Sequence, residues 1–141
     1  MKDPEKVLSV VGEWVAKAEN DLKTARQMLK LGEDCPTDIV CFHAQQCAEK
    51  YIKALLVLDG IDFPKTDHIA RLNKLLPARF RLGLTVEEQR RLTDYATGAR
   101  YPGWDEIPLG EARRAVALAR RVRKGSRALL PARGLRRRRN R

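Results

Sequence analysis

The segment Cys41-Phe-His-Ala-Gln-Gln-Cys-Ala-Glu-Lys-Tyr-Ile-Lys-Ala-Leu-Leu-Val-Leu58 has the apolar spacing of an amphipathic α-helix, with repeats at three and four residues. A surface helix usually carries Glu, Lys and Arg on its outer face. This one also places paired glutamines and a histidine there, and such side chains form hydrogen bonds with a ligand, another subunit or a neighbouring helix. The segment therefore predicts both a helix and a candidate site. The polar residues of that site are His43, Gln45, Gln46, Glu49, Lys50 and Lys53.

Helical periodicity continues on both sides of this segment. Asp3-Pro4 fits an N-cap followed by proline in the first helical turn, and Thr85 with Glu88 forms a capping-box pattern. No segment alternates with a period of two over a useful length, so strands are not expected. The sequence predicts an all-α, antiparallel up-and-down bundle of four to five helices. The expected helices span about residues 4–29, 37–58, 67–76, 86–101 and 109–130.

The positive charge is concentrated at one end of the chain. The net charge is +11, but residues 109–141 hold 13 Lys and Arg against one acid, whereas the preceding residues carry a net charge of −1. We expect residues 1–132 to form the helical bundle and residues 133–141 to form a basic disordered tail, because no apolar periodicity remains there. Such a tail attracts RNA or an acidic partner without sequence specificity. Its candidate contacts are Arg136, Arg137, Arg138 and Arg139.

Composition argues against several classes of protein. Cys35, Cys41 and Cys47 are odd in number and lie six residues apart, which is neither a disulfide framework nor a zinc spacing. No apolar run, Ala54–Leu58 included, is longer than five residues, against the roughly 20 that a membrane-spanning helix needs. The first residues have no apolar core, so a signal peptide is not expected. We therefore expect a protein of the reducing cytoplasm with no membrane contact, no metal and no cofactor.

Two features predict a homodimer. Alanine recurs on the apolar stripes and buries little area per residue, and a thin core of this kind often gains stability by pairing with a second copy. The C-terminal half of the 37–58 helix is also broadly apolar, so it is expected to be covered on more than one side. Two aromatic side chains expected at the surface point the same way. The residues that support this prediction are Ile52, Leu55, Leu56, Trp14 and Trp104.

Three short motifs lie along the chain: Phe42-His-Ala-Gln-Gln46, Ala48-Glu-Lys50 and Ala99-Arg-Tyr-Pro102. In combination they resemble the HEPN domains, and the resemblance covers about residues 14–119. HEPN domains are small helical bundles that usually dimerise. The resemblance implies association with a minimal nucleotidyltransferase, in pairs that look like toxin–antitoxin modules. Many members of the family are ribonucleases.

The sequence departs from the ribonuclease members at one motif. Those members resemble one another in an arginine and a histidine separated by four to six residues, whereas Arg100 is followed at those positions by Asp105, Glu106 and Ile107. Metal-independent RNA cleavage needs a group that takes the proton of the 2′-hydroxyl, and histidine is the usual choice near neutral pH. We therefore assign no catalytic residue, and the sequence argues against an enzyme of this type.

Two further pairs of residues are candidates for ligand binding. Arg100 and Tyr101 either clamp a phosphate, which the guanidinium fork suits, or pack at the end of a helix. Asp67 and His68 stand where relatives commonly have His followed by Asp or Ser, so the imidazole is displaced by one position. A cap and a first-turn residue of the short helix is a simpler role for this pair than a catalytic dyad.

The polar cluster of the 37–58 helix has two interpretations. Its members line a nucleotide or phosphodiester pocket at a dimer seam, or they only form hydrogen bonds across the subunit interface. His43 and Cys47 are spaced to share a metal, but no carboxylate and histidine complete the set, so a structural histidine is the simpler interpretation.

These observations predict a dimeric HEPN-type binding or regulatory module that binds a nucleotide or RNA and pairs with a minimal nucleotidyltransferase. One alternative is an unconventional or degenerate ribonuclease that uses Arg100, His43 or His68. Another is a structural dimer adaptor without a ligand.

Overall fold

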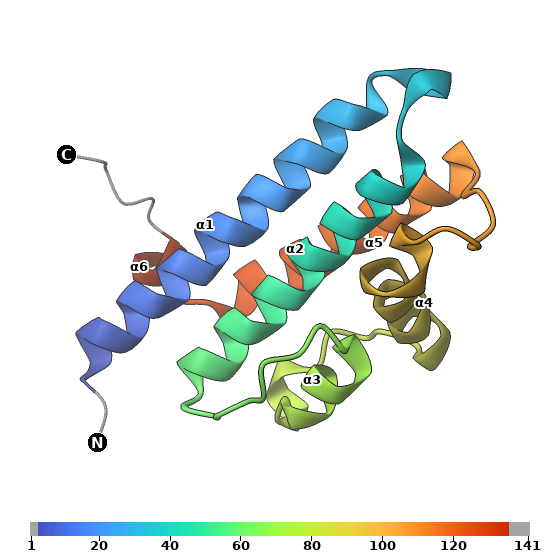
Figure 1. The fold of residues 1–141 in the computed structure, drawn as a ribbon. Helices are drawn as coiled ribbons and strands as arrows, with labels where there is room; N and C mark the ends of the chain where they lie inside the picture. Colours follow the sequence, from blue (N-terminus) through green and yellow to red (C-terminus); the bar gives the residue numbers. More distant parts are fainter. Residues whose placement is uncertain (1–2, 136–141) are drawn as a thin grey trace.

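The computed structural model describes residues 3–135, and all of their regular structure is helical (Figure 1). Short 3₁₀ turns lie at Gly32–Asp34, Ala78–Phe80 and Gly98–Arg100, and the last of these is η3. Within the described residues there is no strand, so the all-α prediction is confirmed. The α-helices are α1 (Pro4–Leu29), α2 (Thr37–Leu58), α3 (Ile69–Leu75), α4 (Val86–Ala96), α5 (Leu109–Leu129) and α6 (Ala132–Leu135).

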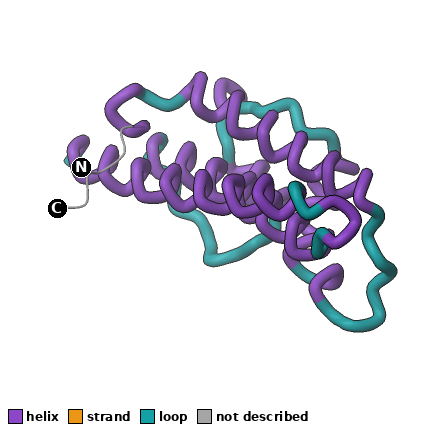
Figure 2. Tube along the Cα trace, turned by 90° about the horizontal axis from the view of Figure 1, so that it is seen from above, coloured by secondary structure: helices purple, strands orange, loops and turns teal. Residues whose placement is uncertain are grey.

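Helix α2 lies at the centre of the bundle. Figures 1 and 2 show α1 running antiparallel beside it, while α3 and α4 lie on the other side of α2. Helix α5 packs behind α2 and runs in the same direction, because the chain returns along α3 and α4 before α5 begins. The bundle therefore keeps the up-and-down order, and α3 and α4 together take the place of its third helix.

The apolar C-terminal half of α2 is enclosed by its own chain. Ile52, Leu55 and Leu56 have no exposed surface, and α1, α3, α4 and α5 all contact this helix. The breadth of this face therefore reflects burial inside one subunit, and it does not argue for a second copy. Trp14 is also partly buried, with its ring edge-on to Phe63 at 6.3 Å between centroids, contrary to the expected exposure. Trp104 is exposed as expected.

Local signals set most of the helix ends. The side chain of Asp3 accepts a hydrogen bond from the backbone N–H of Glu5, and Thr85 with Glu88 forms the full capping box. Gly60 follows α2 with a φ of +69°, a left-handed conformation that glycine adopts without strain. These contacts place α1, α2 and the start of α4 where the sequence pattern predicted them.

Helix α4 ends at Ala96, earlier than the expected end near Tyr101. The backbone leaves the helix at Thr97 and continues as η3. Gly98 allows Trp104 to pack against this turn, because a Cβ at that position would lie 2.7 Å from the ring of Trp104. The loop after η3 thus folds back onto Gly98, a contact that capping rules do not predict.

The end of the bundle also lies beyond the expected boundary at residue 132. Residues 133–135, expected to be part of a disordered tail, belong to α6, which packs on α1. Gly134 is buried there, and a Cβ on it would meet Val11 at 3.1 Å, so its lack of a side chain allows the close approach. Arg133 forms an ion pair with Glu5. The candidate contacts Arg136, Arg137, Arg138 and Arg139 lie outside the described residues.

Within residues 3–135, no helix combines the length and the apolar character that a membrane crossing requires.

The position of α6 predicts different effects for two truncations. A chain that ends after Ala132 loses the packing of Gly134 and Leu135 on α1, and we expect it to be less stable by about 1–2 kcal/mol, the scale for a partly buried leucine. A chain that ends after Leu135 is expected to keep the wild-type free energy of unfolding. Urea denaturation followed by circular dichroism measures both. Equal stability of the two truncated chains would show that α6 does not contribute to the bundle.

Candidate functional site

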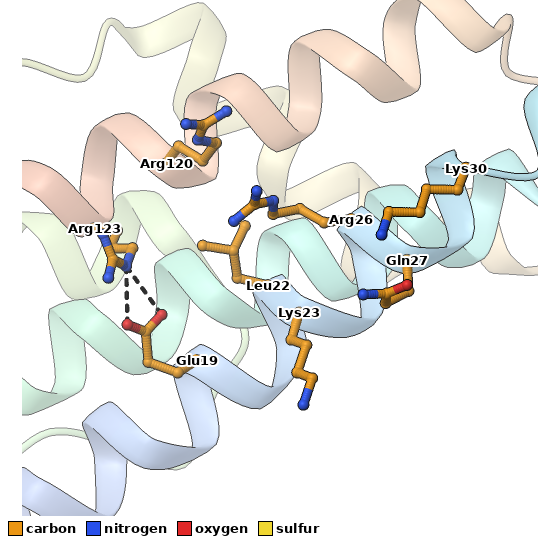
Figure 3. A pocket seen from close by; sticks show the side chains of 8 residues that line it. All are labelled: Glu19, Leu22, Lys23, Arg26, Gln27, Lys30, Arg120 and Arg123. Carbon is orange, nitrogen blue, oxygen red and sulfur yellow. Dashed lines mark hydrogen bonds and ion pairs between the residues drawn. The ribbon is translucent and has the colours of Figure 1, made fainter. Parts of the chain in front are cut away.

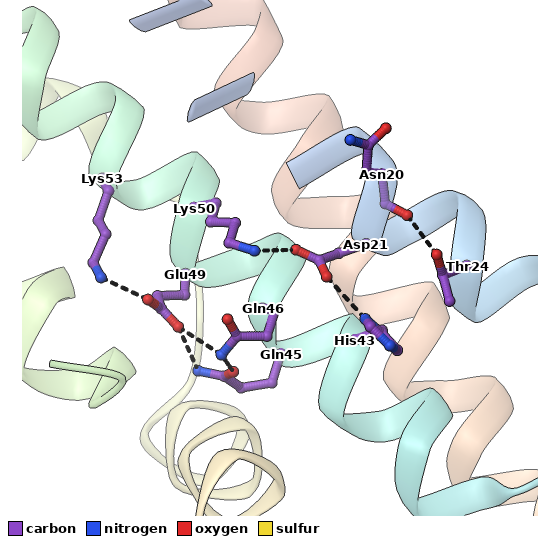
Figure 4. Close-up of polar contacts among 9 residues, drawn as sticks. All are labelled: Asn20, Asp21, Thr24, His43, Gln45, Gln46, Glu49, Lys50 and Lys53. Carbon is purple, nitrogen blue, oxygen red and sulfur yellow. Dashed lines mark hydrogen bonds and ion pairs between the residues drawn. The ribbon is translucent and has the colours of Figure 1, made fainter. Parts of the chain in front are cut away.

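The polar residues that the sequence places on α2 form two clusters (Figure 4). Each cluster joins α2 to another part of the chain, because a polar side chain this close to the core needs a hydrogen-bonding partner. The first cluster joins α2 to α1, and the second joins it to the loop before α3.

The first cluster is built on Asp21 of α1. Its two carboxylate oxygens contact different residues of α2: Nδ1 of His43 lies 2.8 Å from Oδ1, and Nζ of Lys50 donates to Oδ2 at 2.5 Å. Asp21 itself is buried, whereas His43 and Lys50 are partly exposed. When Nδ1 carries the proton, it donates to the carboxylate and leaves Nε2 as an acceptor. Asp21 therefore fixes the orientation of an imidazole that solvent can reach.

The second cluster surrounds Glu49, whose side chain is buried. Lys53 donates to its Oε1 at 2.6 Å, and Gln46 donates to its Oε2 at 2.9 Å. Gln46 also donates to Oε1 of Gln45 at 2.7 Å. Burial raises the pKa of Glu49 to about 7, although the hydrogen bond from Lys53 opposes this shift. Glu49 thus titrates close to neutral pH.

Through this cluster α2 holds the loop that leads to α3. Gln45 donates its side-chain amide to the backbone oxygen of Asp67 at 3.0 Å. The ammonium group of Lys53 lies 5.3 Å from the ring centroid of Trp14 and 5.8 Å from that of Phe63, within the range of cation–π attraction. These contacts bind the loop to both α1 and α2, and they account for Gln45 and Lys53 without a ligand.

Asp67 and His68 do not form a dyad directed at a substrate. His68 is the N-cap of α3, and its Nδ1 accepts a hydrogen bond from the backbone N–H of Arg71 at 3.2 Å. The helix begins at Ile69, so His68 takes the capping role and Asp67 precedes it. The geometry therefore supports the capping role, but the cap is His68 and not Asp67.

Arg100 is the last residue of η3, and Tyr101 follows it as the C-cap. Both are exposed, and the guanidinium carbon of Arg100 stands 4.5 Å from the ring centroid of Phe42 and 5.5 Å from that of Tyr101. Phe42 in turn lies beside His43, with 5.5 Å between the ring centroids. The fold thus brings Arg100 to the His43 cluster, with one aromatic ring between them.

A hollow of about 390 Å³ opens beside Arg100 and Tyr101. It lies between the start of α2 and the loop that follows η3. Arg100 contributes one positive charge to it, Asp38, Asp105 and Glu106 contribute negative charge, and Tyr101 and Trp104 contribute aromatic surface. The guanidinium fork of Arg100 suits a phosphate and the aromatic rings suit a base, whereas the three carboxylates oppose an anion inside the hollow.

Sequence reasoning missed two residues of this arrangement. The first is Asp21, although a carboxylate on the apolar side of α1 is itself a signal of a buried partner. The second is Phe42, which belongs to the Phe42–Gln46 motif but whose contact with Arg100 that motif does not indicate. The contact between them joins residues that are 58 positions apart, and no periodicity in the sequence encodes it.

The described residues offer no metal centre. They contain no group of three or more His, Cys, Asp and Glu side chains that could hold an ion. Cys47 is fully buried, and burial raises the pKa of its thiol far above the ordinary value, so it remains protonated. His43 and Cys47 therefore lack the character of a shared ligand pair.

Comparison with known proteins agrees with this architecture. The model of the HEPN domain family matches residues 11–128. A protein of Methanocaldococcus jannaschii named "Putative toxin MJ1304" is 42% identical over 50 residues, which are 36% of this chain and 31% of the relative. The match thus spans less than a third of that relative's length. No solved structure matches the chain.

The raised pKa of Glu49 predicts a pH-dependent stability. Since the folded pKa of about 7 exceeds the ordinary value of 4.5, the folded state binds more protons between these pH values. Stability should therefore fall as the pH rises through this window, by at most about 3 kcal/mol. The side chain in Glu49→Gln cannot ionise, so the stability of this variant should not show this decrease as the pH rises. Urea denaturation at a series of pH values, compared between wild type and variant, measures the difference.

Glu88→Gln provides a control of opposite sign. The hydrogen bond from Arg121 lowers the pKa of Glu88, so its stabilisation is present above the unfolded pKa and is lost as the pH falls. Identical pH profiles for wild type and Glu49→Gln would contradict the assignment of the raised pKa to Glu49.

Proposed function

The chain belongs to the HEPN family, and from that premise we propose that it is a binding and regulatory module whose ligand is a nucleotide or an RNA. The observation that carries the proposal is the contact of Arg100 with Phe42 beside the Asp21–His43 pair. The ring of Phe42 thus contacts the exposed guanidinium group on one side and lies beside the partly exposed imidazole.

Arg100 is the group on this face that suits a phosphate. It forms no ion pair with a carboxylate among the described residues, and its guanidinium fork matches phosphate oxygens. Asp38, Asp105 and Glu106 line the same hollow, so an anion has to bind on the side of Arg100 that faces away from them. The ring of Phe42 restricts the arginine to this position, so less conformational freedom is lost when an anion binds. Tyr101 is 60% exposed and Trp104 is 45% exposed, so a base attached to the phosphate has rings on which to stack.

The proposal includes the assembly in which the module works. We propose a homodimer that pairs with a minimal nucleotidyltransferase in a toxin–antitoxin-like system in the cytoplasm. The family resemblance supports the pairing, and the name of the Methanocaldococcus jannaschii relative supports the toxin-like role. Three buried free cysteines are consistent with a reducing compartment. Sedimentation of the wild-type protein at micromolar concentration tests the dimer.

A ribonuclease is the second candidate function, and one observation favours it. Asp21 contacts Nδ1 of His43, so Nε2 is a proton acceptor when Nδ1 carries the proton, and Phe42 lies beside His43 and contacts Arg100. Attack by a 2′-hydroxyl requires a base and a cation, and His43 and Arg100 are the candidates for these two groups. The missing histidine after Arg100 would then be replaced by one from α2.

Titration calorimetry with ATP and with GMP tests the binding module. Arg100→Ala removes the charge-assisted contact to phosphate, and we expect a loss of affinity of about 10- to 100-fold. Arg81→Ala is the matched control, because Arg81 is also exposed and lies on a different loop. Absence of binding to the wild type would leave the structural dimer adaptor as the better interpretation.

Incubation with labelled RNA, with and without a chelator, separates the module from the enzyme. We expect no metal-independent cleavage above background near neutral pH, because Arg100 has no histidine at the spacing of the ribonuclease members. Robust cleavage that disappears in both Arg100→Ala and His43→Ala would instead establish the second candidate. Loss in His68→Ala alone would point to the loop before α3.

A further inference from the structure

A second charged surface lies between α1 and α5 (Figure 3). It shares no lining residue with the hollow beside Arg100. It is a groove of about 430 Å³, and we name it the α1–α5 groove. Five of its eight lining side chains are basic, one is acidic and one is apolar. The lining residues are Glu19, Leu22, Lys23, Arg26, Gln27, Lys30, Arg120 and Arg123.

The acidic charge of the groove is already neutralised. Glu19 accepts hydrogen bonds from Arg123 at 2.9 Å and from Arg127 at 3.1 Å. By contrast, among residues 3–135 no carboxylate forms an ion pair with Lys23, Arg26, Lys30 or Arg120, and all four are exposed. Their charges are thus available to an anionic ligand.

The basic surface continues along α5. A neighbouring hollow of about 570 Å³ shares Arg120 and Arg123 with the groove and is otherwise lined by Ala117 and further basic residues. Along α1 the basic side chains extend from Lys23 to Lys30, about 10 Å at 1.5 Å per residue. An extended polyanion can therefore contact several of these charges at once.

We propose that the α1–α5 groove binds the phosphate backbone of RNA. The proposal rests on the proposed function and adds to it the surface that holds the polymer. An acidic protein is the less suitable occupant, since protein interfaces have an apolar core and few lysines, and this groove contributes only Leu22 as apolar lining. Phosphate contacts use the Lys and Arg side chains that it contains.

The groove is separate from the Arg100 face. At 100° per residue, Lys23, Arg26 and Lys30 lie about 140–200° around α1 from Asp21, which faces α2 and His43. The two faces therefore lie on opposite sides of α1. Because no residue is shared, a substitution in the groove leaves the contacts of Arg100 and His43 unchanged.

Fluorescence anisotropy with a short labelled RNA of mixed sequence, across a series of salt concentrations, tests the groove. The variant is the full chain with Lys23→Glu, Arg26→Glu and Arg120→Glu. We expect its affinity at moderate salt to fall by at least about tenfold. The slope of log affinity against log salt should flatten by about 2, because each phosphate contact with a single strand contributes about 0.7.

A control variant separates position from total charge. Arg71→Glu, Lys74→Glu and Arg81→Glu change the net charge equally, at exposed residues on and after α3. This variant should keep the wild-type slope to within about 0.5. A full-length chain with Arg136, Arg137, Arg138 and Arg139 changed to glutamine measures the separate contribution of the C-terminal arginines.

The outcomes distinguish this inference from the proposed function. If the groove variant binds RNA with the wild-type slope, or if the wild type does not bind RNA, the groove proposal is overturned, and nucleotide titration still decides the Arg100 site. If nucleotide binding is absent but RNA affinity depends on the groove, the groove proposal stands and the Arg100 site fails. Displacement of RNA by poly-glutamate at equal charge would favour an acidic protein and overturn RNA as the occupant.

Discussion

The enclosure of α2 by four neighbouring helices is the constraint on which the structure depends. Gln45, Glu49 and Lys53 stand on a helix that has almost no free surface at their positions, so each needs a partner inside the protein. An unpaired buried polar group costs more free energy than an ordinary hydrogen bond contributes. The network around Glu49 supplies these hydrogen-bonding partners, and it also holds the loop before α3 in place.

The same enclosure determines which part of α2 remains accessible to solvent. Phe42, His43, Gln46 and Lys50 of α2 are partly exposed. Asp21 contacts His43 and Lys50 from α1, and Arg100 contacts Phe42 from η3. Core and candidate site therefore share one helix, and the residues deeper in α2 support the orientation of those at the surface.

Much of the fold follows from local patterns in the sequence. Apolar periodicity and capping residues predicted α1, α2 and α5 closely, because these signals act within a few residues. The ends of α4 and of the bundle were predicted less well, since Gly98 and Gly134 matter through contacts with distant groups. The glutamines of α2 were correctly recognised as hydrogen-bonding residues, but their partners are in the same subunit. The position of Arg100 on Phe42 depends on tertiary packing, which residue spacing cannot supply.

The packing of α6 against α1 has a consequence for the order in which the chain can fold. Helices α1 and α2 are neighbours in sequence and can pair early, whereas Gly134 and Arg133 meet Val11 and Glu5 across almost the whole chain. Contacts of such long sequence separation form slowly, because a large loop must close first. During synthesis on the ribosome, the Val11 side of α1 therefore stays without its α6 cover until Ala132–Leu135 have emerged. A nascent or prematurely terminated chain exposes that apolar surface, which is a site for chaperone binding or aggregation.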